Sequence, residues 1–294
     1  MYVKFPKTGL GNMLLLWARA VVFARINHFE LVTSSWWGFR WGALVRQEQK
    51  KRLYWKYFRE AAVFSRIKAL WYLKYRKVIV EPKAEYLSED QSSKCNLYLF
   101  NKVMPDYNLF DPLRGHYNLI VNELHCALRP SKKKLLDKYE RPVIGIHIRR
   151  GDFKLGSTLT PLNYFIEGIK IIREISGDDW PVTVFTDAGK EEIETLLSLP
   201  ATRLAEEKAD ILDILLLSKS DVLLLSGGST FSYWAAFLSN AFVIRPMNDW
   251  LGNIKTQAPE YSNYVEIKWQ HDELDSTLKL KETFNSWQQK TSSR

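Results

Sequence analysis

The chain has 294 residues, of which 46% are hydrophobic and 26% are charged, and its net charge is +9. This composition is typical of a globular protein and excludes a chain that is mainly disordered. The two cysteines, Cys95 and Cys126, lie far apart, which excludes a disulfide framework, so we expect a reduced, cytoplasmic setting.

The amino-terminal residues predict a β-loop-α-β unit. Residues 2–5 alternate in hydrophobicity as a strand does, residues 13–27 form a helical run, and residues 29–33 suggest a second strand. The helical run is too short and too charged to cross a bilayer.

The turn between the first strand and the helix contains Gly9, Gly11 and Asn12. A Gly-x-Gly turn without a third glycine is a weak dinucleotide signal, and Asn12 could instead cap the helix. No acidic residue follows the second strand at a position that would hold a ribose, so a nicotinamide site is not indicated.

The segment 40–77 is strongly basic, with twelve Lys or Arg and two Glu, and it is rich in aromatic residues. It has no proline, and no glycine after Gly42, so we expect one or two long helices. Three interpretations remain open. The aromatic residues could be buried beneath a solvated basic face, or the segment could contact an anionic membrane or nucleic acid.

Residues 78–80 and 97–100 are short strand candidates, and residues 113–128 predict a helix. The polar, basic stretch that follows is bracketed by prolines. We therefore expect a first domain over residues 1–130 with 40–77 as a helical insert, a linker over residues 131–142, and a second domain over residues 143–294.

The second half predicts alternating strands and helices. Apolar runs indicate strands at residues 143–148, 182–185, 222–225 and 242–244, and helices are expected at residues 161–175, 190–197, 210–218 and 230–239. Continuous apolar strands separated by helices are typical of a buried parallel sheet. Ligands of such sheets bind outside the carboxyl ends of the strands.

The first of these strands ends in His147, and Arg149, Arg150 and Asp152 follow it. Two adjacent arginines on extended backbone point in different directions, so one can face a ligand while the other pairs with Asp152 or another acid. A guanidinium matches a phosphate through paired, charge-assisted hydrogen bonds. The stretch therefore predicts an anion site, although His147 could also be an ordinary core histidine.

A second strand-to-helix turn, at residues 225–232, contains two glycines followed by Ser229, Thr230 and Phe231. Small residues let the backbone approach a ligand, and N–H groups at a helix start bind anions. The same residues would also cap a helix that has no ligand.

Two acids complete the set of candidate residues. Asp187 follows the strand at 182–185, and Asp213 lies within an otherwise apolar helical run. A carboxylate in such a run needs a partner, which the paired N–H groups of a guanine ring could supply, but a solvent-facing acid is the alternative. Histidines and cysteines show no metal-ligand spacing, so no metal is expected.

Three ordered blocks resemble the α-1,2-fucosyltransferase family and its relatives that form α-1,6 and protein O-fucose links. They are His147-x-Arg149-Arg150-x-Asp152-Phe153, the run from Asp213 through Ser229-Thr230-Phe231 to Leu238, and the turn Gly9-x-Gly11-Asn12. The resemblance implies an α/β fold of GT-B type, with two Rossmann-like domains facing across a cleft. GDP-fucose would be held mainly by the second domain, and no metal would be needed.

The resemblance also implies roles for individual residues. Arg149 would hold the β-phosphate, Arg150 and Asp152 would shape its loop, and Asp213 and His147 would recognise guanine. Ser229, Thr230 and Phe231 would lie along the diphosphate, and the Gly9–Gly11 turn would bring Asn12 near the transferred sugar. Asp187 is a candidate general base.

The sequence therefore predicts an inverting glycosyltransferase that moves L-fucose from GDP-fucose to a hydroxyl of a glycan acceptor. The acceptor is expected to be galactose, linked α-1,2, in a surface polysaccharide or its lipid-linked precursor. Peripheral contact with the inner face of an anionic membrane through 40–77 is expected, and nucleic acid is not. The alternatives are another GDP-sugar as donor, or a non-catalytic protein that binds nucleic acid or membrane.

Overall fold

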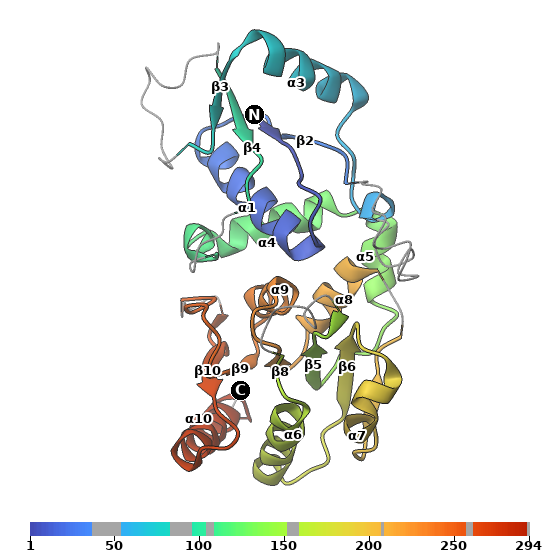
Figure 1. Cartoon of the computed structure of the whole chain (residues 1–294), viewed down its shortest axis with the longest axis vertical. Coiled ribbons are helices and arrows are strands. Elements are labelled where there is room, and N and C mark those ends of the chain that lie inside the picture. Colours follow the sequence, from blue (N-terminus) through green and yellow to red (C-terminus); the bar gives the residue numbers. More distant parts are fainter. Residues whose placement is uncertain are drawn as a thin grey trace. The chain divides into compact units, whose positions relative to one another are not determined.

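The computed structural model describes residues 1–36, 54–82, 96–103, 109–151, 159–206, 209–256 and 261–292. The chain divides into two compact units, Met1–Asp137 with Ala209–Ile211 and Lys138–Lys208 with Leu212–Arg294 (Figure 1). Each unit has its own parallel sheet, so the expected α/β class is confirmed. In the described part of the chain, no helix is long and apolar enough to cross a membrane.

The sheet of the first unit has the strand order β2-β1-β4-β3. Its strands are β1 (Tyr2–Val3), β2 (Val32–Thr33), β3 (Lys77–Val80) and β4 (Asn96–Phe100). Side chains alternate between the two faces of a strand, and Val3 and Tyr98 pack with α1 (Leu10–Ile26) on one face. On the other face, Tyr2 and Leu97 pack with α3 (Val63–Tyr75). Both faces of this sheet are therefore covered by a helix.

The remaining elements of the first unit are short apart from α4 (Tyr117–Ala127), which packs against α1. They are the 3₁₀ turns η1 (Tyr54–Lys56) and η2 (Asp111–Leu113) and the helix α5 (Pro130–Leu136). The helix α5 begins at a proline, which suits a first helical turn because proline lacks the N–H group that would be unpaired there.

The expectation of helix over 40–77 is confirmed for Val63–Tyr75, whereas residues 54–62 form a 3₁₀ turn followed by non-helical chain; residues 37–53 lie outside the described part. Ahead of this helix, Phe58 forms an antiparallel bridge with Leu128, and Arg59 N donates a hydrogen bond of 2.7 Å to the Ala127 carbonyl. Pairing with a distant segment thus replaces the helix that local composition favours.

The sheet of the second unit has six parallel strands in the order β10-β9-β8-β5-β6-β7. The strands are β5 (Ile144–Ile148), β6 (Val182–Thr186), β7 (Thr202–Leu204), β8 (Val222–Leu225), β9 (Phe242–Pro246) and β10 (Val265–Trp269). All residues of β5, β8 and β9 are buried, as expected for central strands with helices on both faces. The four predicted strands of the second half are confirmed.

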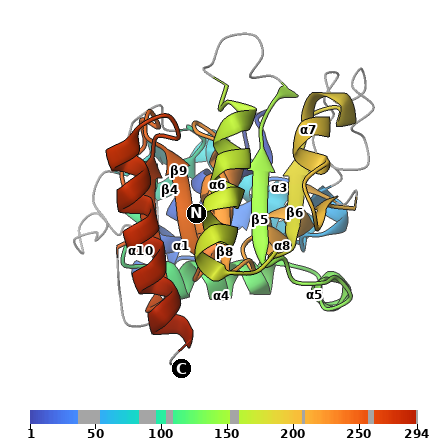
Figure 2. The same cartoon turned by 90° about the horizontal axis from the view of Figure 1, so that it is seen from below.

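Helices cover both faces of this sheet. They are α6 (Leu162–Ser176), α7 (Glu194–Leu197) after the 3₁₀ turn η4 (Lys190–Ile193), α8 (Asp210–Leu217), α9 (Thr230–Leu238) and α10 (Leu274–Ser292). Figure 2 shows α10, α6 and α7 side by side across one face, where they bury the main hydrophobic core. On the opposite face, the end of α8 packs closely on β5. A Cβ atom added at Gly145 of β5 would overlap Ser220 and Leu217.

Candidate functional site

The candidate site residues of the second unit gather at the carboxyl edge of the central strands. In the sheet register, His147 of β5 lies beside Phe185 of β6 and Leu225 of β8. Because the strands are parallel, the residues that follow each of them emerge at the same edge. Arg149, Asp187 and Ser226 therefore meet, although they are far apart in the sequence.

Arg149 is oriented by its neighbours on both sides. Its Nη1 forms an ion pair with Asp187 Oδ2, and its backbone N donates a hydrogen bond of 3.0 Å to Ser226 Oγ. Ser226 Oγ donates in turn to the His147 carbonyl, at 3.0 Å, which links the ends of β5 and β8. The Arg149 side chain is 25% exposed, so its guanidinium lies at the surface of the edge and is held there by a carboxylate.

Arg150 points elsewhere, as expected for adjacent residues on extended backbone. It is buried, and its Nη1 donates 2.9 Å to the Thr160 carbonyl, while its backbone N donates 2.7 Å to Asp187 Oδ1. Burial lowers the pKa of Arg150, against the opposing effect of the Glu192 and Asp187 carboxylates, but a guanidinium stays charged in proteins. Arg150 therefore ties the loop after β5 to the start of α6.

Asp187 is the acid that organises this pair of arginines. One of its oxygens pairs with the Arg149 side chain and the other accepts the Arg150 backbone N–H. A Cβ atom at position 151 would overlap the same carboxylate, which explains why glycine follows the two arginines. The other expected acid, Asp152, lies outside the described residues.

The turn from β8 into α9 is built from side chains as well as backbone. Gly228 has φ of +70°, a left-handed conformation that glycine adopts without strain. Ser229 is the N-cap of α9, with its Oγ 3.5 Å from Ser232 N. Thr230 and Phe231 follow in the first turn, where N–H groups have no partner within the helix.

The N–H groups of the two glycines in this turn already have acceptors within the protein. Gly227 N donates to Thr160 Oγ1 at 3.0 Å, and Gly228 N donates to Tyr233 Oη at 2.5 Å. The reason is physical: a buried N–H group without a partner is costly, and here side chains supply the acceptors. These hydrogen bonds fix the conformation of the turn without a ligand. An anion would therefore bind to the N–H groups in the first turn of α9.

His147 has an internal partner on the α9 side of the sheet. Its Nδ1 lies 2.6 Å from Ser232 Oγ, and its ring stacks on Phe231, with centroids 4.6 Å apart and an interplanar angle of 21°. His147 is only 5% exposed. These contacts fix the ring beside α9, next to the first turn that would face a ligand.

The remaining predicted site residues lie on or beside two other helices, α8 and α1. Asp213 is partly exposed on α8, between buried Leu212 and Ile214. Gly9, Gly11 and Asn12 belong to the first unit: Gly9 precedes α1, and Asn12 lies inside its first turn, so it is not the N-cap. Within the second unit, the structure thus unites Arg149, Arg150, Asp187, His147 and the 226–231 turn.

A buried network behind the turn was missed by the sequence analysis. Tyr233 Oη, which accepts from Gly228, donates 2.6 Å to Asp249 Oδ1, and Asp249 Oδ2 pairs at 3.1 Å with Arg245. Arg245 also pairs with Glu266 at 2.8 Å. An arginine at the end of the apolar strand β9 was the available signal, because a fully buried guanidinium requires carboxylates.

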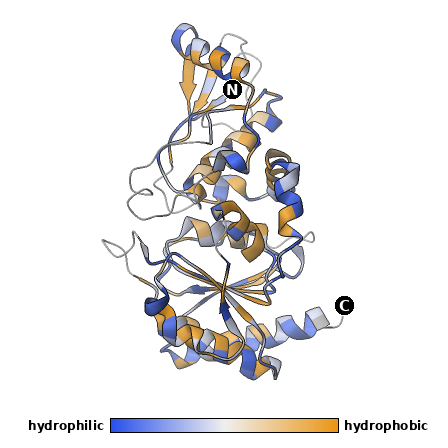
Figure 3. Ribbon diagram, turned by 90° about the vertical axis from the view of Figure 1, so that its right-hand side faces the viewer, coloured by the Kyte–Doolittle hydropathy of each residue, from blue (hydrophilic) through white to orange (hydrophobic). Residues whose placement is uncertain are grey.

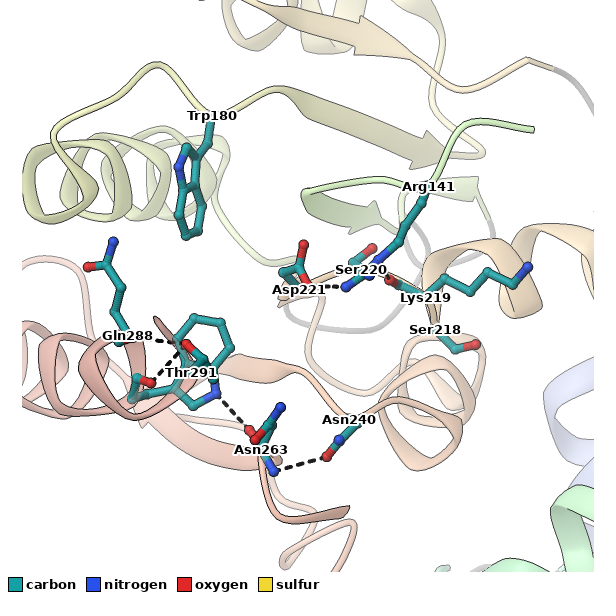
Figure 4. Close-up of a pocket in the computed structure, with 11 residues that line it drawn as sticks. Arg141, Trp180, Ser218, Lys219, Ser220, Asp221, Asn240, Asn263, Gln288 and Thr291 are labelled. Atoms are coloured by element: carbon teal, nitrogen blue, oxygen red, sulfur yellow. Dashed lines mark hydrogen bonds and ion pairs between the residues drawn. The ribbon is translucent and has the colours of Figure 1, made fainter. Parts of the chain in front are cut away.

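Two pockets of the second unit lie at opposite edges of its sheet. One, of about 240 Å³, lies at the carboxyl edge and is lined by Thr160, Pro246 and Trp269 among others. The other, of about 690 Å³, is lined by residues that precede the strands, including Arg141, Asp221 and Trp180, and by residues of α10 (Figure 4). It is the larger of the two, but it contains none of the predicted site residues and lies where ligands of parallel sheets do not usually bind.

Among the residues that the structure covers, no three His, Cys, Asp or Glu side chains gather closely enough to hold a metal ion. Arg149, Asp187 and the start of α9 contribute polar groups to this edge.

Comparisons with known proteins give both a family and a fold. A family model described as glycosyl transferase family 11 matches residues 77–270, which confirms the family resemblance of the sequence motifs. A sequence search of curated proteins found no match.

Solved structures of fucosyltransferases are similar to this chain. A structure of NodZ α-1,6-fucosyltransferase soaked with GDP-fucose is 15% identical, with a TM-score of 0.51, over 86% of this chain and 97% of that one. Fucosyltransferase NodZ from Bradyrhizobium gives 15%, 0.49, 81% and 93% for the same quantities. POFUT1 in complex with GDP-fucose gives 12%, 0.47, 82% and 94%. The first similarity shows a shared fold of GT-B type, and the expected cleft between the two domains stays a prediction.

Proposed function

We propose that this chain, which belongs to glycosyl transferase family 11, transfers L-fucose from GDP-fucose to a hydroxyl group of a glycan. The observation that carries the proposal is the meeting of Arg149, Asp187 and the 226–231 turn at one sheet edge. The similarity of this chain to the structure of NodZ α-1,6-fucosyltransferase soaked with GDP-fucose supports the choice of donor.

In this proposal Arg149 binds the β-phosphate of the donor. Charge builds up on that phosphate as GDP leaves, and a guanidinium already held in place stabilises it without reorganisation. Asp187 would hold Arg149 in this orientation. We favour that role over general base, because both Asp187 oxygens already accept contacts from the arginine pair.

The nucleotide would lie along α9 and α8. The first turn of α9, with Ser229, Thr230 and Phe231, would face the diphosphate, since helix amino termini favour anions. Asp213 would accept the paired N–H groups of guanine, and His147, fixed by Ser232 and Phe231, would border the same position. Asp152 would complete the arginine loop.

The reaction would invert the anomeric carbon of fucose. An acceptor oxygen forms a bond to that carbon while the bond to the β-phosphate oxygen breaks, GDP departs as the leaving group, and the acceptor proton passes to a base or to water. Asn12, with the Gly9–Gly11 turn, would approach the transferred sugar. We infer galactose as the acceptor, linked α-1,2, in a surface polysaccharide or its lipid-linked precursor.

A transfer assay tests the proposal. The wild-type chain is incubated with GDP-fucose and a galactose-terminated oligosaccharide, and NMR identifies the linkage and anomeric configuration of the product. Arg149→Ala should lower kcat/KM by on the order of a hundredfold or more. Arg203→Ala, on strand β7 and paired with Glu140 away from the site, should leave it unchanged. Consumption of GDP-mannose but not of GDP-fucose would show that the donor is another GDP-sugar and contradict GDP-fucose.

A further inference from the structure

The helix α3 presents large apolar side chains to solvent. Of its 13 residues, six are large apolar residues that are at least 55% exposed: Val63, Phe64, Ile67, Leu70, Trp71 and Tyr75. Phe64 is 76% exposed, and Ala69 is the residue of the helix that is buried. Monomeric proteins rarely expose such a continuous apolar surface, and one that does occur usually marks an interaction site.

The helix packs on its sheet through a different face. Ala69, Tyr72 and Leu73 contact Tyr2 and the neighbouring strands. At about 100° per residue, Phe64, Ile67 and Trp71 lie together on the opposite side. An ordinary surface helix would carry polar residues there. The outward side of α3 is therefore apolar, like the side that packs on the sheet. Hydrophobic and hydrophilic residues alternate along this helix, which lies at the top of Figure 3.

Basic residues border this apolar face. Residues 61–80 contain five Lys or Arg and no acidic residue. Lys68, Lys74 and Lys77 are exposed, whereas Arg66 pairs with Glu60 at 3.1 Å and Arg76 lies 3.9 Å from the centre of the Tyr72 ring. Most of this positive charge is thus carried by lysines beside the exposed apolar residues.

We propose that α3 is a membrane-docking helix, which lies in the headgroup region of an anionic lipid bilayer with its outward apolar face inserted. An apolar face bordered by lysines, with tryptophan and tyrosine on it, has the chemistry of an interfacial helix. The lysines would contact lipid phosphates, while Phe64, Ile67 and Trp71 enter the acyl boundary.

A second copy of the chain is a poorer occupant. A symmetric dimer through α3 would bring two lysine-bordered faces of like charge together, which opposes association. An anionic bilayer complements both the charge and the apolar surface. The inference is independent of the fucosyl donor, because α3 contains none of the residues assigned to the reaction.

Sedimentation of the full chain with vesicles tests the inference. Wild type should sediment with vesicles of phosphatidylcholine mixed with phosphatidylglycerol at low salt, and much less with phosphatidylcholine alone or at high salt. Phe64→Ser with Trp71→Ser should weaken binding by on the order of tenfold or more, since two large side chains no longer insert. Leu274→Ser, at a residue of α10 that is 73% exposed, is the matched control and should bind as wild type does.

Further measurements keep the inference falsifiable. Lys68→Glu with Lys74→Glu tests the charge separately and should abolish the preference for anionic vesicles. Wild type that stays in solution with anionic vesicles, or an unchanged Phe64→Ser/Trp71→Ser variant, would overturn the inference. So would ultracentrifugation that shows a dimer lost in that variant, because the apolar face would then be covered by a second copy. Transfer of fucose without vesicle binding would reject the docking helix alone.

Discussion

Arg149 stands at the sheet edge with its guanidinium already paired to the carboxylate of Asp187. A donor phosphate would bind beside this pair, where the Arg149 guanidinium attracts it and offsets the negative charge of Asp187. Removing Arg149 alone would leave the Asp187 carboxylate facing a diphosphate of the same sign. Part of the loss in such a variant would therefore come from repulsion, in addition to the lost hydrogen bonds.

A comparison of variants at these two residues follows from that pairing. Arg149→Ala should weaken GDP binding by at least about tenfold, the cost of losing a charge-assisted contact. Arg149→Ala with Asp187→Asn should recover part of this loss, because the unpaired carboxylate is gone. Calorimetric titration with GDP measures both. A double variant that binds more weakly than Arg149→Ala would contradict the repulsion that we infer.

Lys255 gives a pH dependence that is independent of the candidate site. It is 4% exposed, its Nζ donates to the Ser239 carbonyl, and it lies 4.5 Å from the centre of the Tyr261 ring. Burial lowers its pKa to about 7, against the opposing effect of Glu266. Between that value and about 10.4, the ordinary pKa of lysine, the unfolded chain binds more protons than the folded one, so Lys255 makes stability increase with pH.

Denaturant unfolding of wild type and Lys255→Met should show this effect. The unfolding free energy of wild type relative to Lys255→Met should rise from pH 7 to pH 9, by at most about 1.4 kcal/mol per pH unit. Lys170→Met, on the exposed surface of α6, serves as the control and should track wild type at both values. A difference between wild type and Lys255→Met that falls with pH would contradict the lowered pKa.

Sequence reasoning reached some residues of the site and not others. The Arg149–Arg150 pair was predictable, because it directly follows an apolar strand. Its partner in the fold was not, since pairing with Asp187 depends on β6 lying beside β5. The Tyr233–Asp249–Arg245 network was missed for the same reason: it joins segments that only the folded sheet brings together.

At the scale of elements, the turn between β8 and α9 has a backbone conformation that favours glycine. Gly228 has φ of +70°, where a side chain would cost about 1–2 kcal/mol, and its N–H group is fixed by Tyr233. Gly177, at the end of α6, has the same φ of +70° and nothing within 4 Å of an added Cβ. An alanine at position 177 would therefore introduce the same backbone strain as one at position 228, at a place outside the predicted donor site.

Alanine variants of these two glycines distinguish a loss of stability from a loss of donor binding. Gly228→Ala and Gly177→Ala should lose similar stability in thermal unfolding, because both force alanine into a left-handed conformation. Only Gly228→Ala should raise the KM for GDP-fucose, since it shifts the start of α9 against the diphosphate. Equal KM values for the two variants would show that the turn does not bind the donor.

Elements of the second unit were predictable where hydrophobic runs were continuous and bounded by turn residues. The strands β5, β6, β8 and β9 have that pattern and were found. The edge strands β7 and β10 were not, because partial exposure interrupts their apolar runs, as in Val265–Trp269. The helix α10 was missed as well, although it buries Leu280, Phe284 and Trp287 against the sheet.

At the scale of the whole molecule, the chain carries two parallel sheets, one in each of its units. The second unit contains the arginine pair and the α9 turn, and the first contains Asn12 and the exposed face of α3. The α/β class was predictable from the alternation of apolar strands and helices, and the family from three motifs that follow one another in order along the chain. The outward apolar face of α3 was not, since which side of a helix packs on the sheet depends on the fold.

Ligand-dependent thermal unfolding of the full chain tests the central claim most directly. A ligand that binds only the folded state stabilises it by about 2.7 kcal/mol at a hundredfold excess over Kd. We predict that GDP and GDP-fucose raise the Tm of wild type and that UDP does not, with most of the shift lost in Arg149→Ala. Absence of any shift with GDP, or the same shift in Arg149→Ala, would contradict a guanosine diphosphate site at the end of β5.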